Sequence, residues 1–329
     1  MPTARSTPNI ALVKYWGNRD NTFRLCAADS LSMTLDGPHV DVTVEKAEGF
    51  SVRSTTKELN VKEIARFAKT LDLINTYMRA GGTHLPPFAI TIDSKIPPAI
   101  GLASSSAVFS AFAKAVAGLI NAGLSDEQIS VMARLGSGSA ARSVFGGYGA
   151  IRNLPGNAIG DAVGYQVADE THWPLHDIII VPSVEEKKTG STEGHASAWT
   201  SPMFKDRVAA IPRRMKECTD AILQKDFEKL QRIAEEDCMD MHRCMQTQNP
   251  PLNYLSSETL RIVEEIKALR KTGHLPVLYT MDAGATVHLF CTDEAADAIR
   301  HFARAQKGCA VFQAKTGKGT QIVNGELSW

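Results

Sequence analysis

The sequence predicts an α+β protein of two lobes, in which layers of antiparallel or mixed sheet and helix enclose a cleft. Two patterns support this class. Short runs such as HVDVTVEKA, at residues 39–47, place β-branched residues at every second position, as strands do. Longer runs such as VKEIARFAKTLDLINTYMRA, at residues 61–80, repeat apolar residues at helical spacing, and the two kinds alternate along 329 residues. That length suits two lobes that share a core.

The predicted first lobe covers residues 1–182 and begins with strands. One strand ends at Pro97 and Pro98, because proline cannot donate to a sheet ladder. Gly123 ends a helix rich in small residues, and Ser125 is a candidate N-cap for the helix after it. The segments predicted for this lobe are strands at residues 9–16, 30–37, 39–47 and 87–100, and helices at residues 61–82, 101–124 and 126–138.

The predicted second lobe covers residues 183–329. The continuous apolar strand HDIIIVP, at residues 176–182, comes just before the boundary. The polar stretch SVEEKKTGSTEGHAS, at residues 183–197, is predicted to be a mobile loop. Beyond it, the pattern predicts a pair of helices at residues 207–247 and single helices at residues 258–273 and 293–306. A strand, a turn and a strand are predicted at residues 276–291.

The composition describes an ordinary soluble protein, with 43% hydrophobic and 22% charged residues. Because 36 basic residues balance 36 acidic ones, no overall field attracts nucleic acid or an anionic membrane. No run of about 20 apolar residues could span a bilayer, and the first apolar run is too short for a signal peptide. We therefore expect a cytoplasmic protein without nucleic-acid or membrane partners. A homodimer is also expected, although the composition does not bear on it.

The six cysteines have no disulfide-framework spacing. Cys238 and His242 could share a helix face near Cys244, but a zinc site would need a further ligand from elsewhere. Buried cysteines in a reducing cytosol are the favoured interpretation.

The strongest local signal is PPAIGLASSSA, at residues 97–107. Gly101 lets the backbone approach a ligand, and Ser104, Ser105 and Ser106 begin a helix whose first N–H groups are free to bind an anion. The absence of a Gly-Lys-Ser/Thr ending excludes a Walker loop. Taken alone, the segment fits a tightly packed, capped helix equally well.

Further segments supply the partners that such an anion site needs. GSGSAARSVFGGYG carries Ser137 and Ser139 beside Arg142, whose planar fork suits a carboxylate or phosphate, although a surface arginine in a glycine-rich bend is the alternative. MDAGATVHLF places Asp282 at a strand end, where an aspartate is often only a turn former. NIALVKYWG places Lys14 at another strand end. Two serine turns, a lysine, an arginine and an aspartate together indicate a phosphoryl-transfer site.

NIALVKYWG, GLASSSA, GSGSAARSVFGG and MDAG stand in the order and approximate spacing of the mevalonate diphosphate decarboxylases, within the GHMP kinase superfamily. The segment MDMHRCMQTQNPPLNYL also resembles that family, so the resemblance runs from Pro8 to about Leu289. It implies a GHMP kinase-like fold with an active-site cleft between the lobes. It also implies ATP- and Mg²⁺-dependent phosphorylation of the 3-hydroxyl of a phosphorylated mevalonate. Loss of that phosphate and of CO₂ then gives an isopentenyl product of the mevalonate pathway of isoprenoid biosynthesis.

The resemblance also implies a role for each matching residue. Asp282 matches the catalytic aspartate, usually described as the base for the 3-hydroxyl, and Lys14 matches the lysine paired with it. Arg142 matches the arginine that holds the substrate carboxylate, and Ser137 and Ser139 match serines of the substrate site. The substrate phosphate is expected near Tyr15 and Ser139. The ATP phosphate loop is implied at Gly101, Ala103, Ser104, Ser105 and Ser106, with Ser105 nearest to Mg²⁺.

This chain departs from the family at residue 18. The familiar motif is Lys-Tyr-Trp-Gly-Lys, whose second lysine helps to bind the distal phosphate, whereas this chain has Asn18 followed by Arg19. The segment STEGHASAWTS also lacks an arginine that some relatives use for the diphosphate; it offers His195 and Trp199 instead. Losing a charge-assisted phosphate contact costs about 1.5–3 kcal/mol. The departures predict (R)-5-phosphomevalonate as substrate and isopentenyl phosphate as product.

Three other functions stay open at this point. The first is diphosphomevalonate decarboxylase, if Arg19, Lys187 or Lys188 replaces the missing charge. The second is a mevalonate 3-kinase, although such relatives tend to lack the Lys–Asp pair that Lys14 and Asp282 provide here. The third is an inactive nucleotide-binding or interaction module on the same fold. ATP-dependent CO₂ release would exclude the last two.

Overall fold

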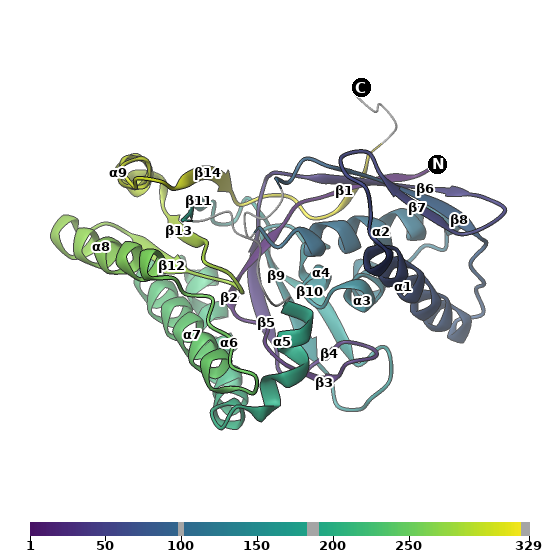
Figure 1. Ribbon diagram of the computed structural model, residues 1–329, viewed down its shortest axis with the longest axis horizontal. Helices are drawn as coiled ribbons and strands as arrows, with labels where there is room; N and C mark the ends of the chain where they lie inside the picture. The colour runs from purple at the N-terminus through teal and green to yellow at the C-terminus, as the bar shows by residue number, and fades with distance from the viewer. Residues whose placement is uncertain (98–101, 183–190, 324–329) are drawn as a thin grey trace.

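A computed structural model of the protein describes residues 1–97, 102–182 and 191–323. It confirms the α+β class, with sheets and helices layered in two halves (Figure 1). Helices α1 to α4 lie in one half, and helices α6 to α9 lie in the other. Strands β2 and β5 run between the two halves (Figure 1). Among the described residues, none of the helices is both long and apolar enough to cross a bilayer.

The first sheet has the strand order β15-β1-β6-β8-β7. Its strands pair antiparallel except β7 and β8, which are parallel. The strands are β1 (Thr3–Ser6), β6 (Val40–Lys46), β7 (Ser51–Ser54), β8 (Phe88–Ser94) and β15 (Gln321–Val323). Helix α2 (Ser104–Ile120) packs on this sheet, and α1 (Val61–Ala80) and α3 (Asp126–Gly136) lie beside it. Capping boxes at Asn60 and Ser125 fix the starts of α1 and α3.

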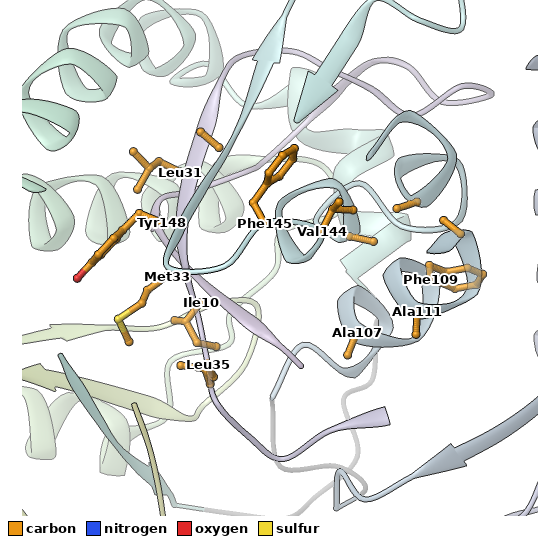
Figure 2. Close-up of a cluster of buried hydrophobic side chains, with 14 of the residues drawn as sticks. Ile10, Leu31, Met33, Leu35, Ala107, Phe109, Ala111, Val144, Phe145 and Tyr148 are labelled. Atoms are coloured by element: carbon orange, nitrogen blue, oxygen red, sulfur yellow. The ribbon is translucent and has the colours of Figure 1, made fainter. Parts of the chain in front are cut away.

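The second sheet has the strand order β10-β9-β5-β2 and forms the centre of the molecule. Its strands are β2 (Asn9–Val13), β5 (Ser30–Thr34), β9 (Tyr148–Asn153) and β10 (Ala162–Ala168). Every residue of β2 and β5 is buried, because helices of both halves cover them. Ile10, Met33 and Tyr148 of this sheet meet α2 and the short helix α4 (Ala140–Ser143) in one hydrophobic core (Figure 2).

The third sheet has the strand order β12-β13-β11-β14. Its strands are β11 (His176–Val181), β12 (Val277–Thr280), β13 (Val287–Cys291) and β14 (Ala310–Lys315). The helices around it are α6 (Phe204–Gln224), α7 (Phe227–Thr247), α8 (Ser257–Gly273) and α9 (Asp293–Arg304). Because β11 pairs with β13 and β14, residues 176–181 share a sheet with the second half of the chain. The lobe boundary at residue 182 stays a prediction.

The segments predicted from apolar periodicity correspond to β2, β5, β6, β8 and β11 to β13, and to the helices α1 to α3 and α6 to α9. The prediction of a loop is wrong at residues 191–197, which form helix α5 (Ser191–Ser197) followed by a 3₁₀ turn at Ala198–Thr200. The structure also contains strands that were not predicted. They are the pair β3 (Asn18–Asp20) and β4 (Leu25–Cys26), and β1, β7, β9, β10, β14 and β15. Most of these are short or lie where turn residues obscure the alternation.

Candidate active site

Two strand ends from opposite halves of the chain bring Lys14 and Asp282 together. Lys14 follows β2, and Asp282 lies two residues after β12. The Lys14 Nζ lies 2.6 Å from Oδ1 of Asp282. The lysine side chain is 1% exposed, whereas the aspartate is 27% exposed and lines a cavity. The pairing predicted from sequence is therefore present in the structure, with the carboxylate on the open side.

Helices α6 and α7 hold the main chain at Lys14. The Lys14 N–H donates to Oδ2 of Asp237 at 2.6 Å, and the Lys14 carbonyl accepts from Nη2 of Arg207 at 3.1 Å. Arg207 also donates to the fully buried Asp237, which accepts a further bond from Arg214. A buried carboxylate that accepts this many hydrogen bonds is held in one position. The lysine is thus fixed by residues more than half the chain away.

Cys238 fixes the other strand end. The N–H of Met281 donates to the Cys238 sulfur at 3.2 Å, one residue before Asp282. Burial acts to raise the pKa of Asp282, but the neighbouring Lys14 ammonium outweighs it and leaves the pKa below its ordinary value. Asp282 is consequently ionised at neutral pH and able to accept a proton.

This balance predicts a pH effect for Lys14→Met. Without the ammonium, burial is opposed only by weaker charges such as Arg142, so the pKa of Asp282 should rise. The acidic limb of the residual kcat/KM should therefore lie at a higher pH than in the wild type, since the base must be ionised. A pH profile of kcat/KM between pH 4 and 9 measures this. An unchanged acidic limb in the variant would contradict a Lys14-controlled base.

Arg142 enters the same cavity from α4 and bonds neutral groups. Its Nε and Nη2 donate to Oδ1 of Asn9 at 3.2 and 3.0 Å, and its Nη1 donates to Oγ of Ser30 at 2.7 Å. These bonds use three of its five N–H groups, and because both partners are neutral they do not neutralise the guanidinium charge. Burial lowers the pKa of Arg142 to about 10, with the nearby Asp282 opposing the change, so the guanidinium stays charged at pH 7. Asn9 and Ser30 were not predicted as site residues from the sequence.

Ser137, Gly138 and Ser139 form the turn between α3 and α4 and line the cavity. A Cβ on Gly138 would lie about 2.4 Å from the Tyr15 ring, so only glycine allows the turn to approach the tyrosine this closely. Tyr15 also lines the cavity, and its hydroxyl donates to Oδ1 of Asn18. The substrate-site residues predicted from sequence thus gather around one cavity, with Asn18 reaching it through Tyr15.

From the sequence, Arg19 could replace the missing charge at residue 18, and Trp199 could occupy the space of the distal phosphate; the structure contradicts both predictions. The Arg19 guanidinium bonds Asn153 at 2.8 Å and the carbonyls of Leu154 and Asp161 at 2.8 and 3.0 Å, in the turn between β9 and β10. Trp199 is 69% exposed and does not line the cavity. Lys187 and Lys188 lie outside the described residues.

His195, on α5, does line the cavity. Its ring lies 4.5 Å from the Tyr15 ring and 4.6 Å from the Trp16 ring, and its Nδ1 accepts from the Gly17 N–H at 3.0 Å. Burial and the nearby Arg24 and Arg142 lower the pKa of His195 to about 3, so the imidazole is neutral at pH 7. This histidine supplies shape and packing and no charge.

Two arginines that the sequence analysis missed, Arg24 and Arg66, also line the cavity. Arg24 is the last residue of the turn before β4, and Arg66 lies on α1. No spacing rule connects them to the serine turns, and only the length of the side chains brings both guanidinium groups to the end of α3. The described lining residues include four cations and one carboxylate, a net of three positive charges; these are Lys14, Arg24, Arg66, Arg142 and Asp282.

A second cavity of about 500 Å³ adjoins the first at the N-terminus of α2. Ser105 and Arg66 line both cavities, and the Ser105 hydroxyl lies 3.2 Å from that of Ser137. Ser104 lines the second cavity and Ala103 the first. The predicted ligand Ser106 is buried, and its hydroxyl donates to the Ala103 carbonyl, so it stabilises the helix start. Gly101 lies outside the described residues.

The second cavity fits a nucleotide and a magnesium ion. Apolar rings of Phe67 and Phe109 and the cations Lys57 and Lys95 line it, a mixture that suits a base and a phosphate chain. No side chain among the described residues caps the first turn of α2, whose N–H groups favour an anion. Within the described ranges there is no group of three His, Cys, Asp or Glu side chains placed to bind a metal. Ser105 offers one oxygen, which suits Mg²⁺ held mainly by phosphate and water.

The comparisons with known proteins agree with this geometry. Two family models match: the diphosphomevalonate decarboxylase-like N-terminal domain at residues 6–157, and the mevalonate 5-diphosphate decarboxylase C-terminal domain at residues 177–324. Diphosphomevalonate decarboxylase of Ganoderma lucidum is 33% identical over an alignment of 315 residues that covers 89% of this chain and 78% of the relative. The crystal structure of mevalonate diphosphate decarboxylase from Staphylococcus aureus has a TM-score of 0.89 at 27% identity, over 98% of each chain.

A further solved structure, described as MDDEF in complex with MVAPP, AMPPCP and magnesium, has a TM-score of 0.87 at 26% identity, over 98% of each chain. The two-lobed architecture with the cavity between its halves is thus the GHMP kinase fold. Within that class, the chain belongs to the diphosphomevalonate decarboxylase family. The resemblance inferred from its motifs is confirmed over nearly the whole chain.

Proposed function

We propose that the protein is an ATP- and Mg²⁺-dependent decarboxylase of (R)-5-diphosphomevalonate in the mevalonate pathway. The observation that carries the proposal is the Lys14–Asp282 pair, 2.6 Å apart, in a cavity that Arg142 and Ser139 share and that adjoins the nucleotide-sized cavity at Ser105. Family membership and the relatives named diphosphomevalonate decarboxylase support it. The homodimer and the cytoplasmic location stay predictions.

The mechanism assigns a task to each of these residues. ATP supplies the phosphoryl group that converts the substrate 3-hydroxyl into a leaving group. Asp282, kept ionised by Lys14, accepts the hydroxyl proton, and the Lys14 ammonium stabilises negative charge that develops at the oxygen. Arg142, which uses three N–H groups to bond Asn9 and Ser30, donates its two remaining N–H groups to the substrate carboxylate. The C–C bond to the substrate carboxylate then breaks, and its electron pair forms the double bond of the product as CO₂ leaves. The phosphate on the 3-oxygen departs with the electron pair of the C–O bond.

The monophosphate prediction made from the sequence needs correction. It rested on a pocket short of cations, whereas Arg24 and Arg66 line the cavity. Trp199 is exposed and does not line the cavity. The relatives, moreover, are named for the diphosphate. One observation still favours (R)-5-phosphomevalonate as a second candidate: Asn18, where the family has a lysine, makes a neutral bond to Tyr15.

A steady-state comparison of the two substrates tests the proposal. We expect ATP-dependent CO₂ release with kcat/KM higher for the diphosphate than for the monophosphate. A higher value for the monophosphate would transfer the assignment to the second candidate. ATP consumption without CO₂ would leave a mevalonate 3-kinase, and no turnover of either substrate would leave an inactive module; the intact Lys14–Asp282 pair speaks against both.

The variant Asn18→Lys should improve the diphosphate substrate and leave the monophosphate nearly unchanged. A lysine here adds a charge-assisted contact to the distal phosphate, and every ~1.4 kcal/mol regained raises kcat/KM about tenfold. Because two arginines are already in the cavity, we expect a gain of about threefold to tenfold. The matched control is Asn21→Lys, since Asn21 is exposed at the same turn. Equal gains in both variants would indicate general electrostatic attraction and contradict a specific contact.

A further inference from the structure

We propose that Arg24 and Arg66 form a phosphate subsite that binds the 5-phosphate end of the substrate and replaces the cation that is missing at Asn18. The inference rests on the proposed function, because it names the group that this part of the cavity recognises. Nothing in the family motifs marks either arginine; the evidence is their position, their bonds and their charge.

The end of α3 holds the two guanidinium groups side by side. Nε of Arg24 donates to the carbonyl of Leu135 at 3.2 Å, and Nε and Nη2 of Arg66 donate to the carbonyl of Gly136 at 3.1 and 2.8 Å. The Arg66 guanidinium also lies 4.5 Å from the centre of the Phe109 ring. These contacts orient both forks and leave four N–H groups of Arg24 and three of Arg66 for a ligand. The next turn along the chain is Ser137 to Ser139, so the forks lie beside the substrate serines.

Neither arginine has an ion-pair partner within the described part of the chain. The acid nearest in sequence to Arg66 is Glu63, which bonds Lys57. Burial and the adjacent Arg24 lower the pKa of Arg66 to about 10, and burial also lowers the pKa of Arg24. Two half-buried like charges oppose each other, and a doubly charged anion between them removes that cost. Phosphate has the charge and the oxygen geometry for two arginine forks.

The two cavities separate the tasks of the pair. Arg24 lines only the first cavity. Tyr15, whose hydroxyl bonds Asn18, lines the same cavity, so we assign Arg24 to the substrate. Arg66 lines both cavities beside Ser105, so it stands where the substrate phosphate and the nucleotide phosphates come together. Lys14 is bound to Asp282 and Arg19 to a distant turn, so among the described residues we assign this pair as the cations for the 5-phosphate end.

The test compares Arg24→Gln, Arg24→Lys and Arg66→Gln with Arg19→Gln, whose guanidinium bonds the β9–β10 turn outside the cavity. We expect Arg24→Gln to raise KM for the phosphorylated mevalonate about 10- to 100-fold with KM for ATP within about twofold. Arg66→Gln should raise both constants, and Arg24→Lys should recover part of the loss. Arg19→Gln should leave both unchanged. A rise in KM for ATP alone in Arg24→Gln, or no change in either constant, would overturn the proposal.

A binding measurement separates this proposal from the proposed function. Calorimetric titration of the protein with inorganic pyrophosphate needs no turnover, and thermal melts verify that each variant is folded. Affinity for pyrophosphate should fall about tenfold or more in Arg24→Gln and Arg66→Gln and stay within about twofold in Arg19→Gln. If the wild type turns over neither phosphorylated mevalonate yet shows this pattern, the function fails and the anion subsite stands. Equal affinity in all variants removes the subsite, whatever the activity.

Discussion

Asp282→Asn should lower turnover by at least about 10³-fold while the protein stays folded. The amide cannot accept the proton of the 3-hydroxyl, and it no longer neutralises the buried Lys14, 2.6 Å away in the wild type. The carboxylate lies in an open turn between β12 and β13 and is 27% exposed, so the fold does not depend on it. ATP-dependent CO₂ release in the steady state measures the effect.

The control for this prediction is Asp297→Asn, on the exposed face of α9 and outside the cavity. It should keep wild-type turnover. Nucleotide binding should survive in both variants, because the second cavity is lined from α1, β8 and α2 and does not include Asp282. If Asp282→Asn retained turnover within about threefold of the wild type, Asp282 would not be the base.

Arg142→Lys should lower kcat/KM about 100-fold although the charge is kept. The arginine reaches Asn9 and Ser30 with three N–H groups and still presents two to the cavity; one ammonium cannot do both. Either Asn9 Oδ1 loses its partners or the substrate carboxylate loses its bidentate contact, and 100-fold corresponds to about 2.7 kcal/mol. Most of the loss should be in KM, since the carboxylate is bound before the reaction.

The matched control is Arg152→Lys, because Arg152 lies on β9 of the same sheet, is exposed, and stacks on Tyr165 at 4.7 Å. We expect wild-type kinetics there. Wild-type kinetics in Arg142→Lys as well would mean that Arg142 has only a structural role in holding β2 and β5 together.

The sequence places Lys14 and Asp282 at the ends of apolar strands, and the family resemblance implies that they pair. A lysine and an aspartate just beyond buried strands leave the sheet at its edge, where side chains of different strands meet. Arg142 was predictable because it follows a glycine-serine turn, has a planar fork that suits an anion and matches the family's arginine. Strand ends, turn composition and the resemblance thus identified these three residues.

Arg24, Arg66 and Asn9 were not predictable from spacing, because their roles depend on which segments pack together. Arg66 sits on an amphipathic helix, where an arginine usually faces water, and only the approach of α3 turns it into the cavity. Ser106 illustrates the converse: three consecutive serines look equivalent in the sequence, yet helical geometry points one of them inward to the Ala103 carbonyl.

The position of β1 between β6 and β15 has a consequence for how the chain folds. Thr3 pairs with Val323 on one side and with Thr43 on the other, so one edge of β1 finds its partner only when nearly the whole described chain has been synthesised. Until then the unpaired edge is open to pairing with other chains. Contacts this distant in sequence slow folding, because a long loop must close first. We therefore expect the nascent protein to depend on chaperones longer than its early, locally paired strands suggest.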